Sequence, residues 1–195
     1  ALKMEPRGVL AMVNEAMAYA RMGENQKAND ALQKALKVAP DNAAANFNMG
    51  LLKAEENDLV TAEKHLRAAF KTDPQMAQAA YNLCVILAKD RLDEAVDFCR
   101  KAADIRPDVP RYAFTLAFYQ QQKGDFTDAA SVLHELLDRH PTFADAYMLL
   151  GSIYERQGNR TEAENVYVKG LGAEGISNRH KIAIKTRLDI LKSSG

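Results

Sequence analysis

Residues 144–167 read ADAYMLLGSIYERQGNRTEAENVY, and this segment shows most clearly the pattern from which the fold can be predicted. The same pattern of small and large residues returns along the chain at a nearly constant interval. Five of the six prolines are spaced by 34, 34, 33 and 34 residues: Pro6, Pro40, Pro74, Pro107 and Pro141. A constant period in this range indicates an array of structural repeats, each of which is one supersecondary unit.

The copies alternate small and large residues at fixed places, counted from the start of each copy. They span 9–42, 43–76, 77–109, 110–143 and 144–177. Small residues occupy place 8: Ala16, Gly50, Cys84, Ala117 and Gly151. Larger residues occupy place 24: Leu32, Leu66, Cys99, Leu133 and Tyr167. Small residues let two helices approach closely, and each helix pair leaves an apolar face that its neighbour covers. The pattern therefore predicts a stack of helix pairs.

This pattern resembles the tetratricopeptide repeat, a 34-residue unit with the signature W-x2-L-G-x2-Y…A-x3-F…P. The fifth copy is the best match, through Tyr147, Leu150, Gly151, Tyr154, Ala163 and Tyr167. The resemblance covers residues 9–177 and implies an all-α, right-handed superhelical solenoid of five helix-turn-helix repeats. The fifth copy has Gly175 in place of the proline, and we expect its second helix to fray early.

The turn inside each repeat should contain a residue with left-handed backbone, because such a residue ends the first helix. The candidates are Gly23, Asn57, Gly124 and Gly158. Repeat three is one residue short and has no such candidate. We therefore expect a tighter turn around residues 89–91.

The N-terminal segment reads like the end of a repeat. Ala1–Pro6 resembles Ala35–Pro40, so residues 1–8 are interpreted as the remnant of a preceding repeat in a longer protein. Without that repeat, an apolar face around residues 10–17 would be uncovered. We therefore expect self-association through the N-terminal repeat.

The C-terminal segment, residues 178–195, is interpreted as a capping helix and tail. Ile184, Leu188 and Leu191 have the spacing of a helix with one apolar face. Residues 178–192 contain five basic residues and one acidic residue, a net charge of +4. Terminal repeats require a polar outer face, which this helix would supply. The alternative is a basic patch for an acidic partner or lipid.

The charge balance restricts the class of partner. The 195 residues contain 26 basic and 26 acidic side chains, so the formal net charge is zero. We expect no nucleic-acid partner, because phosphate binding needs a basic surface. The apolar runs are far shorter than the roughly 20 residues that a membrane helix needs, so we expect no membrane span. No signal peptide is visible. The compartment stays undetermined, with the cytoplasm slightly favoured, because targeting signals of a longer parent would lie outside this stretch.

The side chains that often carry chemistry form no recognisable site. Cys84 and Cys99 are interpreted as two small core residues, with an intrarepeat disulfide as the alternative for an exported parent. The four histidines are scattered, and none completes a set of metal ligands. The run Gly170–Gly175 is a loose match to a glycine-rich nucleotide loop, but it follows a helix rather than a strand. We expect no enzyme activity and no catalytic residue, metal or cofactor.

The resemblance implies that the first helix of each repeat lines a concave groove that holds a partner. The candidate binding residues are Val13, Asn14, Met17, Phe47, Asn48, Leu51, Tyr81, Asn82, Val85, Arg111, Phe114, Thr115, Phe118 and Met148. Asparagine recurs at place 6 of the first three repeats. An asparagine amide can donate to and accept from a peptide backbone, so this row predicts a ladder for an extended segment. The alternative is that asparagine is common at this place whether or not a repeat binds peptide.

The aromatic floor of this groove should be partly exposed in the free protein and buried in a complex. It consists of Phe47, Tyr81, Phe114 and Phe118. The carboxylate clamp by which some family members hold chaperone C-termini needs Lys, Asn, Asn, Lys and Arg at set places. From repeat one, this chain offers Val13, Met17, Asn48, Gln78 and Asn82, and the other registers fail too. We therefore expect a different partner.

The function implied is a non-enzymatic scaffold that holds a segment of a protein partner. One alternative is a regulatory or substrate-presenting arm of a larger enzyme. The other is a self-assembling structural module.

Overall fold

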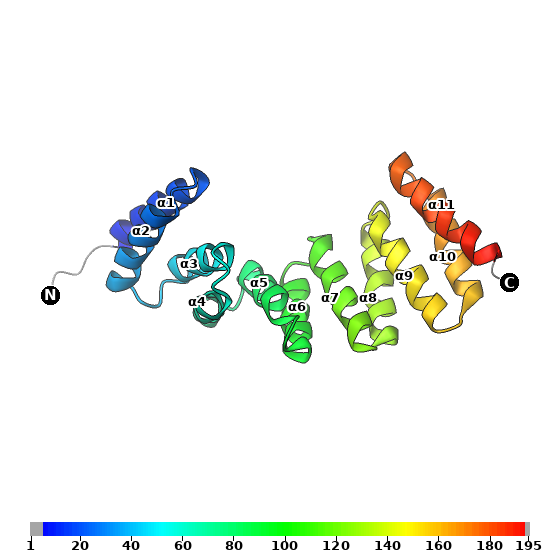
Figure 1. The fold of residues 1–195 in the computed structure, drawn as a ribbon, viewed down its shortest axis with the longest axis horizontal. Helices are drawn as coiled ribbons and strands as arrows, with labels where there is room; N and C mark the ends of the chain where they lie inside the picture. The colour runs from blue at the N-terminus through cyan, green and yellow to red at the C-terminus, as the bar shows by residue number, and fades with distance from the viewer. Residues whose placement is uncertain (1–5, 194–195) are drawn as a thin grey trace. The chain divides into compact units, whose positions relative to one another are not determined.

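The computed structural model describes residues 6–193, and side chains from residue 8 onward. Between residues 6 and 193 every regular element is an α-helix. In chain order (Figure 1) they are α1 (Pro6–Arg21), α2 (Asn25–Val38), α3 (Ala43–Glu55), α4 (Leu59–Thr72), α5 (Ala77–Leu87), α6 (Leu92–Ile105), α7 (Pro110–Lys123), α8 (Phe126–Arg139), α9 (Ala144–Arg156), α10 (Arg160–Gly172) and α11 (Asn178–Ser193). The predicted all-α repeat solenoid is confirmed. Part of the predicted N-terminal remnant, residues 1–5, lies outside the described residues, as do residues 194 and 195 of the tail.

The small residue at place 8 sets the distance between the two helices of a repeat. A Cβ atom added to Gly151 would lie 2.3 Å from the ring of Tyr167, and one added to Gly50 would lie 2.7 Å from Cγ of Leu66. Both partners occupy place 24. The small and large residues that recur in the sequence are therefore one packing contact, repeated along the chain.

The turns follow the prediction from glycine and asparagine. Gly23, Gly124 and Gly158 have φ angles of 75°, 94° and 72°, and Asn57 has φ of 62°. In repeat three, α5 ends at Leu87, and no residue between it and α6 has positive φ. This repeat turns without a left-handed residue, as its missing position predicted.

The helices group into two compact units, Ala1–Ile105 (unit 1) and Arg106–Gly195 (unit 2). Unit 1 contains α1 to α6 and unit 2 contains α7 to α11. In unit 1 an apolar cluster joins α1, α2 and α3. In unit 2 a second cluster extends from α7 to α11. The regular period of the sequence predicted one continuous array of repeats.

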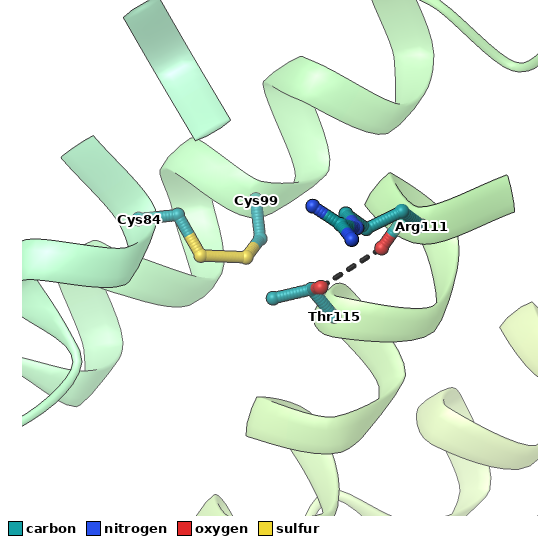
Figure 2. Close-up of a disulfide and its surroundings, with 4 residues drawn as sticks. All are labelled: Cys84, Cys99, Arg111 and Thr115. Carbon is teal, nitrogen blue, oxygen red and sulfur yellow. Dashed lines mark hydrogen bonds between the residues drawn. A yellow bond between two sulfur atoms is a disulfide. The ribbon is translucent and has the colours of Figure 1, made fainter. Parts of the chain in front are cut away.

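The two cysteines of repeat three are bonded to each other. Cys84 on α5 and Cys99 on α6 form a disulfide, which Figure 2 shows, with 5.1 Å between their Cα atoms. Both side chains are fully buried. They are core residues, as predicted, and they also form the intrarepeat disulfide that the sequence left open as the alternative. They occupy places 8 and 24, so the bond replaces the packing contact of the other repeats.

The C-terminal helix α11 covers the end of unit 2. Ile184 and Leu188 are buried and Leu191 packs against the same core, as their spacing predicted. Arg187 makes two hydrogen bonds to the carboxylate of Glu155 on α9, at 2.9 and 2.6 Å. Lys192 pairs with Glu164 on α10 at 2.8 Å. Two of the five basic residues therefore hold the cap in place rather than form a basic patch.

In helix α10, which precedes α11, close packing requires a glycine at position 170. A Cβ atom there would lie 2.9 Å from Cγ of Tyr147 and 3.2 Å from Cδ1 of Ile184. Helix α10 ends at Gly172, one repeat place earlier than the second helices of the other four repeats, which is the direction expected from the glycine in place of the proline. Among the described residues, no helix is both long and apolar enough to cross a membrane.

Candidate functional site

The candidate surface in unit 1 is built from the first helix of each repeat. Places 6 and 9 lie one helical turn apart on the same face, because residues at i and i+3 are neighbours on a helix. Place 6 carries Asn14, Asn48 and Asn82, and place 9 carries Met17, Leu51 and Val85. None of these six side chains is buried. We call these six residues the first-helix surface.

The amides of this surface are oriented by their own helices. Nδ2 of Asn48 donates to the carbonyl oxygen of Ala44 at 2.8 Å, and Nδ2 of Asn82 donates to that of Gln78 at 2.8 Å. Each bond uses one of the two amide N–H groups and leaves the carbonyl oxygen available as an acceptor. The two amides are therefore held in the same way before any ligand arrives.

In unit 2, Thr115 occupies the same place with similar geometry. Its Oγ1 donates to the carbonyl oxygen of Arg111 at 2.8 Å, the contact drawn as a dashed line in Figure 2. Arg111 itself is exposed. The hydroxyl has donated its only hydrogen, so towards a ligand it can act only as an acceptor.

The aromatic residues are partly exposed, as expected for a free binding surface. Phe47, Tyr81 and Phe114 are half-buried and Phe118 is exposed. Phe114 also contacts the ring of Phe143, with 5.4 Å between centroids, and packs against the core of unit 2. Its role is shared between core and surface.

Two of the predicted residues belong more to the core than to a surface. Val13 is only 3 % exposed, because Val9, Val13 and Ala16 form the stripe of α1 that packs into the cluster with α2 and α3. The prediction that Val13 lines a groove is therefore wrong. Met148 is half-buried and packs against the core of unit 2.

A small cavity opens beside the first-helix surface of unit 1. It lies between α1, α2 and α3 and has a volume of about 80 Å³. Met17, Asn48, Leu51 and Glu55 line it, together with buried residues of the helix pair. The first two repeats therefore bring an amide, apolar groups and a carboxylate to one opening.

Glu155 on α9 is engaged by side chains of its neighbours. Glu155 accepts a hydrogen bond from the Tyr167 hydroxyl at 2.6 Å in addition to those from Arg187. Burial, followed by the contact with Glu155, raises the pKa of Tyr167. The carboxylate is thus part of the attachment of α11 rather than a free groove charge.

Sequence reasoning missed two side clefts that contain histidine. In unit 1 a cleft of about 450 Å³ is lined by Asn29, Lys53 and His65 among others. Nδ1 of His65 lies 2.8 Å from Oδ1 of Asn46, and burial lowers the pKa of His65. In unit 2 a cleft of about 430 Å³ contains the pair His134 and Tyr154.

The register of the repeat was the signal that could have found these clefts. Gln33 and His134, which line the two clefts, both occupy place 25 of their repeats, and Lys53 and Tyr154, which also line them, both occupy place 11.

Within the part of the chain that the structure describes, no three His, Cys, Asp or Glu side chains are grouped so that they could hold a metal ion.

Comparison with protein families identifies the class. A family model described as tetratricopeptide repeat matches residues 47–110 and 114–173, and a second with the same description matches residues 9–42. The chain therefore belongs to the tetratricopeptide repeat family. Such repeats are generally interaction modules without catalytic activity. No curated protein sequence matches the chain.

Solved structures share the fold. The crystal structure of MamA matches with a TM-score of 0.75 at 22 % identity, over 86 % of this chain and 92 % of that one. YrrB, described as a TPR protein with an unusual peptide-binding site, matches with a TM-score of 0.75 at 19 % identity, over 90 % of both chains. PilF of Pseudomonas aeruginosa matches with a TM-score of 0.69 at 18 % identity, over 96 % of this chain and 88 % of that one. At these identities the likeness concerns the fold alone.

Proposed function

We propose that the chain is a non-enzymatic scaffold that holds a segment of a protein partner along the first helices of its repeats. The observation that carries this proposal is the repeated amide of unit 1. Asn48 and Asn82 are held by equivalent hydrogen bonds, one repeat apart, and each leaves its carbonyl oxygen as an acceptor. An acceptor repeated at a regular step suits a backbone that presents donors at a regular step.

The apolar side chains beside the amides support the same proposal. Met17 of the first repeat is 38 % exposed and Val85 of the third is 42 % exposed. Leu51, at the same place of the second repeat, is half-buried. Exposed apolar side chains rimmed by polar groups are typical of interaction surfaces. The amides would hold the partner's backbone, and the apolar residues would contact its side chains.

The test is selection of random twelve-residue peptides on phage, with wild-type protein and with the variant N14A/N48A/N82A. We expect peptides that bind the wild type to lose affinity by about fivefold or more for each amide that they use, because a lost hydrogen bond costs about 1 kcal/mol. The matched control is Asn165→Ala, which removes an exposed asparagine of α10.

Two results would contradict the proposal. In one, the selected peptides bind the triple variant as tightly as the wild type. In the other, Asn165→Ala weakens binding equally. Sedimentation velocity on the same samples shows whether the chain also binds itself, to which Leu10, 59 % exposed on α1, would contribute.

A further inference from the structure

The cleft of about 450 Å³ in unit 1 has no part in the proposed function. Its walls come from three helices: α2 with Asn29 and Lys37, α3 with Met49, and α4 with Thr61 and His65. We call it the α2–α4 cleft. None of the six residues of the first-helix surface lines it. A ligand in this cleft would therefore occupy a second site of the same repeats.

The α2 wall of the cleft contains a buried acceptor without a partner. Asn29 is only 9 % exposed, and its Oδ1 accepts no hydrogen bond from any residue between 8 and 193. A buried acceptor without a partner destabilises the folded state, and such groups are rare in folded proteins. The same place of repeat four holds Ala130, so the repeat fold does not require an amide there. A donor on a ligand would satisfy this oxygen.

His65 adds a second acceptor from the α4 wall. Nδ2 of Asn46 donates to the carbonyl oxygens of Pro40 at 2.8 Å and Asn42 at 3.1 Å, so its Oδ1 is left as an acceptor. Nδ1 of His65 lies 2.8 Å from this oxygen and therefore carries the ring proton. Burial lowers the pKa of His65, which favours the neutral ring. In that ring Nε2 is an acceptor.

The charge of the cleft restricts the kind of donor. Lys37 is exposed and forms no ion pair within the described part of the chain. Lys53, in contrast, pairs with Glu56 at 2.8 Å. No acidic side chain lines the cleft. Because like charges repel, a lysine or arginine of a partner is disfavoured here. The cleft favours a neutral donor with acidic groups beside it.

The apolar part of the lining suits an aromatic ring. Leu36 and Met49 line the cleft, and a methionine sulfur makes favourable contacts with aromatic rings. The free ammonium of Lys37 can also lie over a ring face. The cleft measures about 450 Å³, whereas an engineered cavity that binds benzene measures about 150 Å³. Among neutral side chains, tyrosine and tryptophan combine an aromatic ring with a hydrogen-bond donor.

The equivalent cleft of unit 2 differs at the two residues that carry this argument. Ala130 and Asp138 line it at places 21 and 29, where the α2–α4 cleft has Asn29 and Lys37. It therefore lacks the buried amide, and its charge at place 29 is reversed. A ligand that fits the α2–α4 cleft should not fit this one, and the two residues supply substitutions for a test.

We propose that the α2–α4 cleft binds a tyrosine or tryptophan side chain of a protein partner, with acidic residues on either side of it. The O–H or N–H of the ring donates to Oδ1 of Asn29, with Nε2 of His65 as a second acceptor. The ring contacts Leu36 and Met49, and a flanking carboxylate faces Lys37. This site is separate from the first-helix surface, so the inference goes beyond the proposed function.

The test measures fluorescence anisotropy of labelled peptides with the whole chain. The peptide EEYEE has the proposed chemistry, EEFEE lacks only the hydroxyl donor, and KKYKK reverses the flanking charge. We expect the wild type to bind EEYEE about fivefold tighter than EEFEE, which corresponds to about 1 kcal/mol for the hydrogen bond. KKYKK should bind more weakly than EEYEE. High salt should weaken the binding of EEYEE, because salt screens the exposed charge of Lys37.

Two substitutions copy the cleft of unit 2 into unit 1. Asn29→Ala should remove the preference for EEYEE over EEFEE without destabilising unit 1, because alanine favours a helix and carries no unpaired oxygen. Lys37→Asp should prefer KKYKK over EEYEE. The matched control is Lys71→Asp, because Lys71 is exposed at the same place of repeat two and lies outside the cleft. It changes the net charge equally and should keep the wild-type order of preference.

A tryptophan peptide shows directly whether the ring becomes buried. The chain contains no tryptophan, so all tryptophan emission from a mixture with EEWEE comes from the peptide. Binding to the wild type should shift this emission to shorter wavelengths. An unshifted emission from bound peptide would mean that the ring stays in water and does not enter the cleft.

Several outcomes overturn the proposal. They are equal binding of EEYEE and EEFEE, an unchanged preference in Asn29→Ala, the same switch in Lys71→Asp as in Lys37→Asp, and no binding of EEYEE at millimolar concentration. A peptide EESEE that binds as tightly as EEYEE overturns the aromatic requirement. The variant N14A/N48A/N82A should bind EEYEE like the wild type. If it does not, the peptide occupies the first-helix surface, and the cleft proposal fails while the proposed function stands.

Discussion

The disulfide of repeat three allows a quantitative prediction about local stability. Cys84 and Cys99 are separated by 15 residues and join the two helices of one repeat. Closing a loop of this length lowers the entropy of the unfolded chain, which corresponds to about 3 kcal/mol at room temperature. We expect reduction to lower the free energy of opening α5 and α6 by about this amount.

Hydrogen exchange is the appropriate assay, because repeat proteins open locally and a single free energy of unfolding does not describe them. A loss of about 3 kcal/mol corresponds to roughly 150-fold faster exchange of the slowest amides in α5 and α6. Amides of α9 and α10, in unit 2, should change little. The thiol content of the denatured protein before and after reduction establishes that the bond is present.

A matched variant separates the covalent bond from the packing. Repeats one and four carry alanine and leucine at the same two places, in Ala16 with Leu32 and Ala117 with Leu133. The variant C84A/C99L copies that pair into repeat three, so it should fold with exchange rates that do not respond to reductant. The reasoning is refuted if oxidised and reduced wild type exchange α5 and α6 at the same rate, or if C84A/C99L responds to reductant as the wild type does.

Two further predictions concern packing and pH. Gly151→Ala should destabilise unit 2 by about 1–3 kcal/mol, because the new Cβ atom would lie 2.3 Å from the ring of Tyr167. Gly172→Ala is the control and should not destabilise unit 2, because its new Cβ atom would meet no neighbouring group within 4 Å. Thermal unfolding measures both variants, and equal effects would contradict the packing argument. Burial, and then the charges of Lys64 and Lys53, lower the pKa of His65 below its ordinary value of 6.5, so the unfolded chain binds more protons and the stability of unit 1 should fall as pH drops below about 6.5. His65→Gln should remove this part of the pH dependence in denaturant titrations, and an unchanged dependence would show that another group causes it.

Features that depend on local geometry could be predicted from the order of the residues. The 34-residue period identified the helix pairs. The positive φ angles of Gly23 and Asn57 followed from residue type, because few residues tolerate that backbone conformation. The pairing of Gly151 with Tyr167 followed from the fixed places of small and large residues, since steric fit between two adjacent helices is repeated in every unit. The one-sided apolar spacing of α11 was likewise sufficient to predict which face packs on the core.

The role of each exposed place in its own repeat depends on tertiary contacts that the repeat pattern does not contain. Val13 occupies a place that is half-exposed in later repeats, yet in the first repeat the packing of α1 on α2 and α3 buries it. Nothing in the sequence around Glu155 indicates that Arg187, 32 residues later in the chain, binds its carboxylate. The bond between Cys84 and Cys99 likewise depends on how closely α5 approaches α6. The physical reason is the same in each case: burial, pairing and bonding depend on neighbours that lie far away in the chain, and a repeat pattern specifies the average neighbour but not the particular one.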